Sequence, residues 1–233
     1  MLDMIILLAK ICGAVVVGIF AGHAVVYIFN KIPAQWLCDY GQKPDEALED
    51  PHQQRVKGVP WKWVFSGFFM AGGIRLVIED WAFAAAAVVF CWALLEIGLA
   101  DKKYGIIPDQ FVILTAISAL GFIPFHSSFL QPMWGMLLGG GVMLASALIG
   151  KLILKKETLG FGDVKLFAAA GLALGFRGTL WVLVLSAVGS AVIFSVLLLM
   201  RKIKKEDMVP LGPYICGAGI FYVVIVWPLL VKM

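Results

Sequence analysis

Residues 4–29 read MIILLAKICGAVVVGIFAGHAVVYIF, an apolar run in which Lys10 is the single charged residue. A helix needs about 20 predominantly apolar residues to cross the hydrocarbon core of a membrane, and this run is longer than that. It is also longer than the apolar core of a secretory signal peptide, and no small-residue cleavage site is placed to end it. We therefore expect an uncleaved transmembrane helix.

The rest of the chain continues the same pattern. Of its 233 residues, 61% are hydrophobic and 15% are charged, and the mean hydropathy is +0.94. A soluble globular domain is usually about 45–50% apolar and about 25% charged. The composition therefore excludes a soluble dinucleotide-binding enzyme or a nucleic-acid-binding module, and it predicts an all-α, polytopic membrane protein.

The cysteines give no sign of a metal site. The chain has four of them, and none belongs to a CxxC pair. Structural zinc sites and disulfide frameworks both depend on cysteines at characteristic spacings. We therefore expect no bound metal, no cofactor and no disulfide framework.

Further apolar runs follow a mostly polar segment at residues 30–63, which we expect to be the only substantial loop. These runs cover residues 64–78, 81–99, 110–125, 132–150, 164–176, 179–200 and 209–231. Together with the first run they predict about eight transmembrane helices. We expect residues 1–233 to form a single membrane-embedded domain.

Basic residues predict the orientation of these helices. Fifteen of the 19 Lys and Arg residues fall in one set of alternating connections, which includes the 30–63 loop. The opposite set has only Arg75, Arg177 and Lys232 near its ends. Connections rich in Lys and Arg usually face the cytoplasm. We therefore expect a multi-pass protein of the cell membrane, with the loop at 30–63 in the cytoplasm and both termini outside.

Two acidic residues lie at the predicted cytoplasmic ends of apolar runs. Asp101 lies in ALLEIGLADKKYGIIPDQF (93–111), and Asp163 lies in ETLGFGDVKLFAAAGLALG (157–175). A carboxylate at the hydrocarbon boundary is costly, so it is a candidate functional group. Two carboxylates that share a site separate their pKa values, so one keeps its proton, and such a pair can activate water and protonate a leaving amine. The pair therefore predicts aspartic-protease chemistry.

Each acid also has a simpler interpretation when it is taken alone. Asp163 follows Gly160 and Gly162 and could be a plain helix N-cap after a flexible loop. Asp101 could be an ordinary interfacial helix end. Glu96 lies half a turn away from the face of Asp101, and we do not expect it to share the site. Only the occurrence of both aspartates at one membrane depth favours catalysis.

The motifs around these acids resemble those of type 4 prepilin peptidases. The run from Asp101 to Asp109 resembles the family's D-x7-D segment, and GFGDVKL at 160–166 resembles its GxGDxKL signature. AGHAVVYIFNKIP (21–33) and VPLGPYICGAG (209–219) resemble two further family segments in the same order. GxGD alone also occurs in presenilin-like proteases, so the ordered combination carries the resemblance.

The resemblance implies a set of site residues and a substrate. It identifies Asp101 and Asp163 as a catalytic dyad. It makes Gly160, Gly162, Lys165, Pro108 and Asp109 the residues that support the motifs. The implied function is cleavage of the short basic leader of type 4 prepilins or pseudopilins at the cytoplasmic membrane face, so the expected partners are these substrates and membrane lipid. The oligomeric state stays open.

One departure from the family concerns the loop after the first helix. Bifunctional bacterial members have two CxxC pairs there, thought to bind zinc, and they also methylate the new amino terminus. This chain keeps only Cys38 in that loop. The resemblance therefore implies a short form with peptidase activity and without zinc, and it leaves N-methylation open.

Alternatives from other classes also stay open. A proton-coupled transporter could use Asp101, Asp163 and Glu96 as a relay, although the two aspartates are expected at one face rather than at the midplane. A membrane scaffold without activity is a third possibility. Lys165 could act on a carboxylate or a substrate carbonyl, or it could be an interfacial lysine. The small residues at 139–141 and 168–171 could contact a substrate helix, but we favour packing between the chain's own helices.

Overall fold

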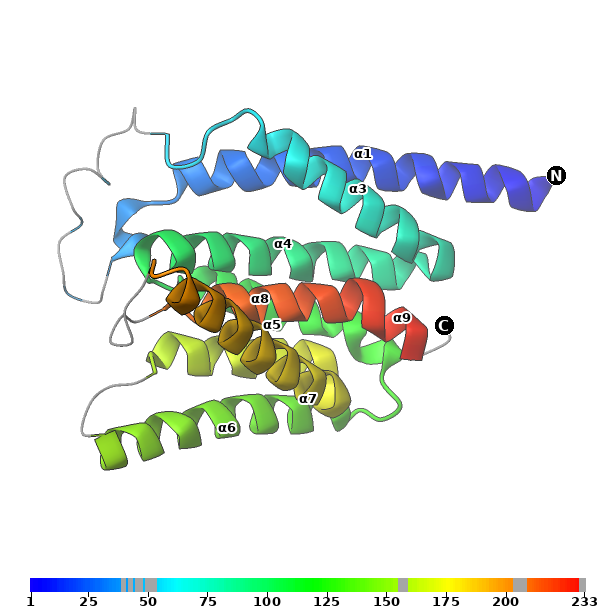
Figure 1. The fold of residues 1–233 in the computed structure, drawn as a ribbon. Helices are drawn as coiled ribbons and strands as arrows, with labels where there is room; N and C mark the ends of the chain where they lie inside the picture. The colour runs from blue at the N-terminus through cyan, green and yellow to red at the C-terminus, as the bar shows by residue number, and fades with distance from the viewer. Residues whose placement is uncertain are drawn as a thin grey trace.

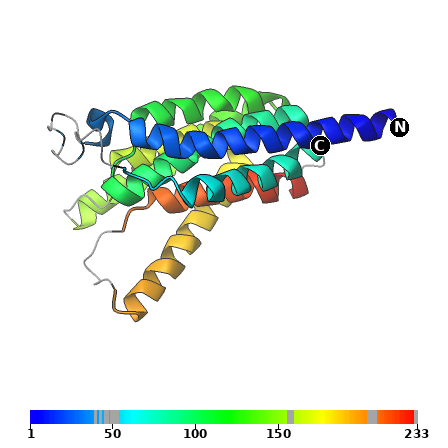
Figure 2. The ribbon, with the colours of Figure 1, turned by 90° about the horizontal axis from the view of Figure 1, so that it is seen from above.

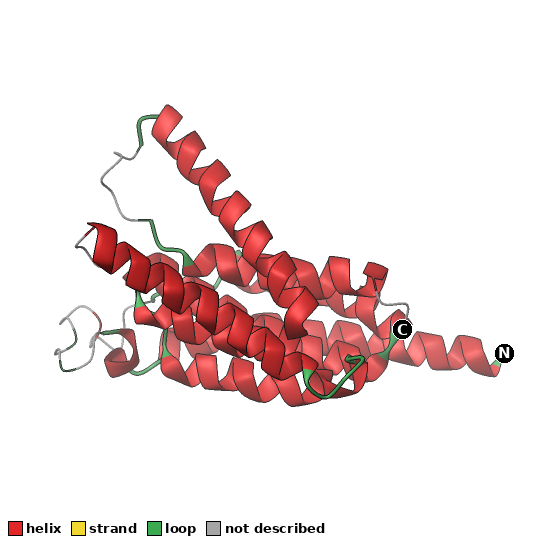
Figure 3. Ribbon diagram, turned by 90° about the horizontal axis from the view of Figure 1, so that it is seen from below, coloured by secondary structure: helices red, strands yellow, loops and turns green. Residues whose placement is uncertain are grey.

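The computed structural model describes residues 1–38, 41, 44, 48, 54–154, 159–202 and 209–230, and within these residues it contains helices and no strand (Figure 3). In chain order the elements are α1 (Leu2–Lys31), η1 (Ala34–Leu37), α3 (Trp61–Glu79), α4 (Trp81–Tyr104), α5 (Asp109–Phe122), η2 (Ile123–Phe125), α6 (Gln131–Leu154), α7 (Phe161–Leu199), α8 (Gly212–Phe221), η3 (Tyr222–Val226) and α9 (Trp227–Leu230). The predicted all-α fold class is therefore confirmed.

Five of the described helices are long and apolar enough to cross a membrane. They are Leu2–Lys31, Trp81–Tyr104, Gln131–Ile153, Phe161–Leu199 and Gly212–Leu230. The helical segment 109–125 is apolar but shorter, and α3 is not among the five. The chain is therefore a polytopic membrane protein, whereas the predicted count of eight spans is not confirmed.

Helix α7 contains both of the runs that were predicted as separate spans at 164–176 and 179–200. Near the end of the first run the backbone of Gly175 leaves the helical region, with φ 68° and ψ 179°. A positive φ of this kind is readily adopted only by glycine. The two views from above and below show the second half of α7 leaving the bundle at an angle (Figures 2 and 3). The break thus lies inside one long helical element, at Gly175, two residues before the predicted gap at 177–178.

The small residues of α6 and α7 lie where these two helices touch. A Cβ atom added to Gly135 would collide with the carbonyl oxygen of Gly171, and one added to Gly139 would lie 2.5 Å from the carbonyl oxygen of Phe167. At Gly141, by contrast, an added Cβ would meet nothing within 4 Å. The favoured interpretation, packing between the chain's own helices, is therefore confirmed for Gly139 and Gly171.

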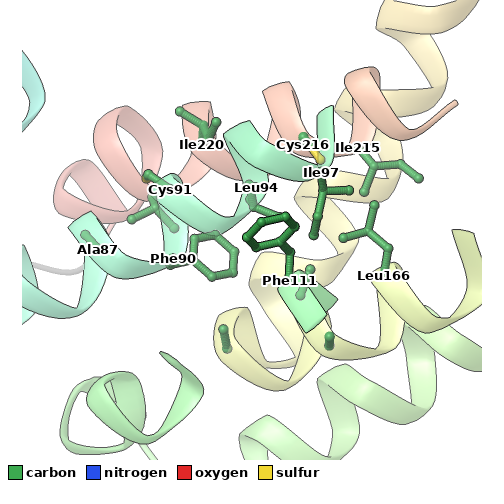
Figure 4. Packing of buried hydrophobic residues seen from close by; sticks show 14 of the residues in the cluster. Ala87, Phe90, Cys91, Leu94, Ile97, Phe111, Leu166, Ile215, Cys216 and Ile220 are labelled. Atoms are coloured by element: carbon green, nitrogen blue, oxygen red, sulfur yellow. The ribbon is translucent and has the colours of Figure 1, made fainter. Parts of the chain in front are cut away.

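Helix α4 lies in the middle of the bundle beside α8, and the hydrophobic core surrounds it (Figures 1 and 4). Phe90, Leu94 and Ile97 of α4 pack there with Phe111 of α5 and with residues of α7 and α8. Both termini lie at one end of the bundle, and the connection from α4 to α5 lies at the other end (Figure 1). This opposite end holds the candidate site.

The segment that follows α1 is tied back to that helix. Arg55 donates hydrogen bonds to the carbonyl oxygens of Phe29, Ile32 and Leu48. Asn30 donates to the carbonyl of Val56 and accepts from its amide, at 2.9 Å each. Helix α1 ends at Lys31 and α3 begins at Trp61, so the connection starts two residues later and ends three residues earlier than the predicted loop at 30–63. Most residues from 39 to 53 of this loop lie outside the described part of the chain.

Candidate active site

Asp101 lies in the last turn of α4, and local chemistry ends the helix just after it. Gly105 takes the left-handed conformation, with φ 67°, and its amide donates to the carbonyl of Asp101 at 2.8 Å. Pro108 then precedes the first turn of α5 in an extended conformation. The connection between the helices is therefore short and keeps Asp101 and Asp109 at the same end of the bundle.

Asp163 lies in the first turn of α7. Its amide donates to the carbonyl of Gly160, which is extended at φ −71° and does not use the left-handed region. A Cβ atom at Gly162 would lie 3.1 Å from Cβ of Ile107, so glycine lets α7 begin close against the α4–α5 connection. Gly162 therefore permits close approach here, and neither motif glycine uses a backbone conformation closed to other residues.

The two aspartates line one cavity of about 640 Å³. All seven residues that the sequence indicated, Asp101, Pro108, Asp109, Gly160, Gly162, Asp163 and Lys165, line this same cavity. Its remaining walls include Gln35, Trp36 and Cys38 from η1 and the residue after it. The structure thus brings three segments that are distant in sequence to one end of the bundle.

The floor beneath the two acids is hydrophobic and closely packed. Ile97, Leu166 and Ile215 lie about one helical turn along α4, α7 and α8 from Asp101, Asp163 and Gly212, and Figure 4 shows the three gathered together. All three side chains are fully buried. Water that reaches the acids therefore enters from the end of the bundle.

Asp101 is held by the start of α8. Its side chain is 6% exposed, and its Oδ2 accepts a hydrogen bond from the amide of Gly212 at 2.9 Å. A Cβ atom at Gly212 would lie 2.5 Å from this oxygen, so only glycine fits here without displacing the carboxyl group. Asp163 lies close enough to interact electrostatically with Asp101, and its buried Oδ1 has no hydrogen-bond partner among the described residues.

Gly212 is a site residue that we did not predict. The signal that could have found it is the segment VPLGPYICGAG, which we used only as evidence of resemblance. No spacing rule connects this glycine to Asp101, because the two are 111 residues apart. The contact depends on α8 packing beside α4, which is a property of the tertiary fold.

Lys165 forms an ion pair with Asp109. Its Nζ lies 2.9 Å and 3.0 Å from the two carboxylate oxygens, and both side chains are about one third exposed. The pair connects the first turn of α7 to the first turn of α5. The sequence suggested that Lys165 acts on a carboxylate or a substrate carbonyl, or that it is an interfacial lysine. It did not identify Asp109 as the partner.

Other candidate residues lie elsewhere or have local partners. Glu96 is fully buried, its carboxyl oxygens have no partner among the described residues, and it does not line the cavity. His23 contacts the carbonyl of Ile19 and the hydroxyl of Ser66. In the part of the chain that the structure describes, no three His, Cys, Asp or Glu residues are grouped so that they could hold a metal ion. The absence of metal stays a prediction.

Comparison with known proteins identifies related sequences. Residues 88–196 match the type IV leader peptidase family, a range that contains both aspartates of the cavity. A prepilin leader peptidase/N-methyltransferase of Stutzerimonas stutzeri is 30% identical over 148 residues, which cover 62% of this chain and 50% of that protein. The protein of that name from Pseudomonas aeruginosa is 28% identical over 148 residues, with the same two shares.

A longer match extends the similarity over most of the chain. The prepilin leader peptidase/N-methyltransferase of Xanthomonas campestris pv. campestris is 25% identical over 256 residues, covering 91% of this chain and 88% of that protein. The chain nevertheless spans about half the length of the first relatives that it matches. No solved structure matches the chain.

Proposed function

We propose that this chain, which carries a type IV leader peptidase domain at residues 88–196, cleaves the leader from prepilins or pseudopilins. Asp101 and Asp163 are the catalytic dyad, and the cut is made at the cytoplasmic face of the membrane. The names of the relatives supply the substrate class. Methyl transfer, which those names also include, is not part of the proposal.

One observation carries the proposal: Asp101 and Asp163, from the ends of two different helices, line a single cavity at one end of the bundle. The cavity has polar groups at its wall and a dry, packed floor below them. A peptide that enters from the membrane surface would meet both carboxyl groups at once. That is the geometry that hydrolysis by an acid–base pair requires.

The chemistry divides between the two acids. One carboxylate accepts a proton from water as the water oxygen bonds to the scissile carbonyl carbon, and the other, protonated acid donates to the carbonyl oxygen. When the tetrahedral intermediate collapses, the C–N bond breaks and the leaving amine takes up a proton from the dyad. The amide of Gly212 stabilises the ionised form of Asp101, so Asp101 is suited to be the base and Asp163 the acid.

The supporting residues hold this geometry. The ion pair between Lys165 and Asp109 fixes the first turn of α7, and therefore Asp163, against α5. Gly162 lets this turn approach Ile107 closely. The proposal places the cut at the cytoplasmic face because the connections at this end of the bundle contain most of the Lys and Arg residues.

The test uses a prepilin-type substrate and the protein reconstituted in lipid. Asp101→Asn and Asp163→Asn should each lower the rate of leader release by about a hundredfold or more, because each variant removes one member of the acid–base pair. Glu79→Gln is the matched control, because Glu79 is a carboxylate at the opposite end of the bundle, in an exposed pair with Arg75. Mass spectrometry of the products identifies the cleaved bond.

The outcome can contradict the assignment clearly. All variants should insert and unfold at the wild-type temperature, since Asn matches Asp in size. If either variant kept about a tenth of the wild-type rate or more, that aspartate would not be a catalytic group. The transporter alternative would instead predict proton uptake into liposomes without any substrate cleavage. Its relay would need Glu96, which does not line the cavity.

A further inference from the structure

A second cavity of about 820 Å³ lies at the other end of the bundle, where the chain termini are (Figure 1). It is bordered by the turn from η2 to α6, by the first residues after the break in α7, and by η3 and α9. The dyad does not contribute to it. None of the motifs that indicate the peptidase explains why such a space is present.

Most of its wall is apolar and preformed. Leu180, Trp181 and Val184 form one side along α7, and Leu230 contributes from α9. Behind them Trp227 packs in a cluster of aromatic rings. Its ring centroid lies 5.1–5.8 Å from those of Phe83, Phe122, His126 and Tyr222. A wall built from interlocked rings keeps its shape when no ligand is present.

A small number of polar groups interrupt this wall. Arg177 lies at the exposed rim, and no described acidic residue lines the cavity. The side chain of Trp227 is 3% exposed, yet its indole Nε1 has no hydrogen-bond partner among the described residues. Burial lowers the pKa of His126, so near neutral pH its imidazole is uncharged and Arg177 supplies the positive charge. The cavity therefore presents one cation, Arg177, beside apolar walls.

We propose that this cavity binds one anionic phospholipid. The phosphodiester accepts hydrogen bonds from Arg177 at the rim, and an acyl chain lies along Leu180 and Val184. Arg is well suited to phosphate because its planar donors match the phosphate oxygens. A soluble anion would leave the apolar wall exposed to water, and a purely apolar ligand would leave Arg177 without a counter-charge.

The site also bridges the break in α7. Leu174, before Gly175, and Arg177, after it, both line the cavity. A bound lipid would contact both halves of the helix and stabilise the angle between them. Binding to the folded protein alone raises its stability, so the lipid should raise the unfolding temperature.

The experiment measures lipid retention and stability in the full chain. The protein is reconstituted into vesicles of phosphatidylcholine with or without phosphatidylglycerol, and bound lipid is counted by native mass spectrometry. Wild-type protein should retain one phosphatidylglycerol and unfold at a higher temperature when this lipid is present. Arg177→Gln should weaken retention by about tenfold, since a charge-assisted hydrogen bond is lost, and Arg177→Lys should restore part of it.

Two further variants separate the cavity from general surface charge. Arg75→Gln removes the same charge from the same end of the bundle, outside the cavity, and should retain lipid as wild type does. Val184→Trp keeps Arg177 but fills the apolar side, and should lower retention. Each variant must unfold at the wild-type temperature in phosphatidylcholine alone, so that lost retention is not lost folding.

Other outcomes overturn the proposal. Equal retention in all variants would mean that no specific site exists. Displacement by glycerophosphate at the same concentration as the lipid would identify a free-anion site. Displacement by a prepilin-type helix would mean that the cavity holds substrate. The proposed lipid site does not depend on the proposed peptidase activity. Asp101→Asn and Asp163→Asn should therefore retain the lipid as wild type does.

Discussion

At the residue scale, the contact between Gly212 and Asp101 leaves no room for a side chain at position 212. The amide of Gly212 reaches Oδ2 of Asp101 at 2.9 Å, and this approach is possible because no side chain stands between them. The hydrogen bond fixes one oxygen of the carboxyl group and leaves the other to meet water. In the proposed mechanism Gly212 is therefore a positioning residue, which acts through Asp101.

Gly212→Ala should lower leader release by about tenfold or more, because the new Cβ atom would lie 2.5 Å from Oδ2 and displace the carboxyl group. The measurement is kcat and KM for a prepilin-type substrate, with the change expected in kcat. Gly217→Ala is the matched control, because it lies in the same helix and an added Cβ meets nothing within 4 Å. Equal losses in both variants would indicate a general defect of α8.

The site residues differ in how well the sequence predicts them. Asp101 and Asp163 were predicted because two acids at the ends of apolar runs are rare and costly, and a nearby motif marks each one. The pairing of Lys165 with Asp109 was not predicted, since it joins residues 56 positions apart and depends on how α5 and α7 pack. Short motifs identify chemical groups, whereas the contacts between those groups follow from tertiary structure.

At the scale of the elements, α7 carries the feature that shapes the bundle. Tertiary packing favours glycine at its break, because a Cβ atom at position 175 would lie 2.8 Å from Cε1 of His126. The sequence predicted two helices in this region from two apolar runs, with the break between residues 176 and 179. The exact position could not be predicted, since Gly171, Gly175 and Gly178 are all glycines within a few residues.

Gly175→Ala should destabilise the protein by roughly 1–3 kcal/mol, because alanine resists a positive φ and its methyl group would also meet His126. Thermal unfolding in detergent measures this change. Gly189→Ala in the same helix is the control. An added Cβ meets nothing there within 4 Å, so this variant should be neutral or slightly stabilising. Unchanged stability in Gly175→Ala would mean that α7 does not break at this residue.

At the scale of the whole molecule, the two ends of the bundle differ in chemistry. One end holds the cavity lined by Asp101 and Asp163, and the other end holds the cavity with Arg177 beside an apolar wall. Membrane orientation decides which compartment each end meets. The all-α class and the membrane location were predictable from composition, because an apolar fraction of 61% leaves few other architectures. The number of spans was less predictable, because α3 and α5 are shorter or less apolar than the five clear candidates.

The last prediction concerns this orientation. Lys57 lies in the connection from α1 to α3, which belongs to the basic set, and Ser128 lies in the turn from η2 to α6 at the other end. Both residues are exposed. Because basic connections stay in the cytoplasm, a cysteine at Ser128 should react with a membrane-impermeant maleimide added to whole cells. A cysteine at Lys57 should react only after the cells are opened. Both variants are made in a chain whose own four cysteines are replaced by serine or alanine, and that chain must still release the leader. The reverse labelling pattern would place the cavity of Asp101 and Asp163 outside the cell. It would exclude cleavage at the cytoplasmic face, even if both aspartates proved essential.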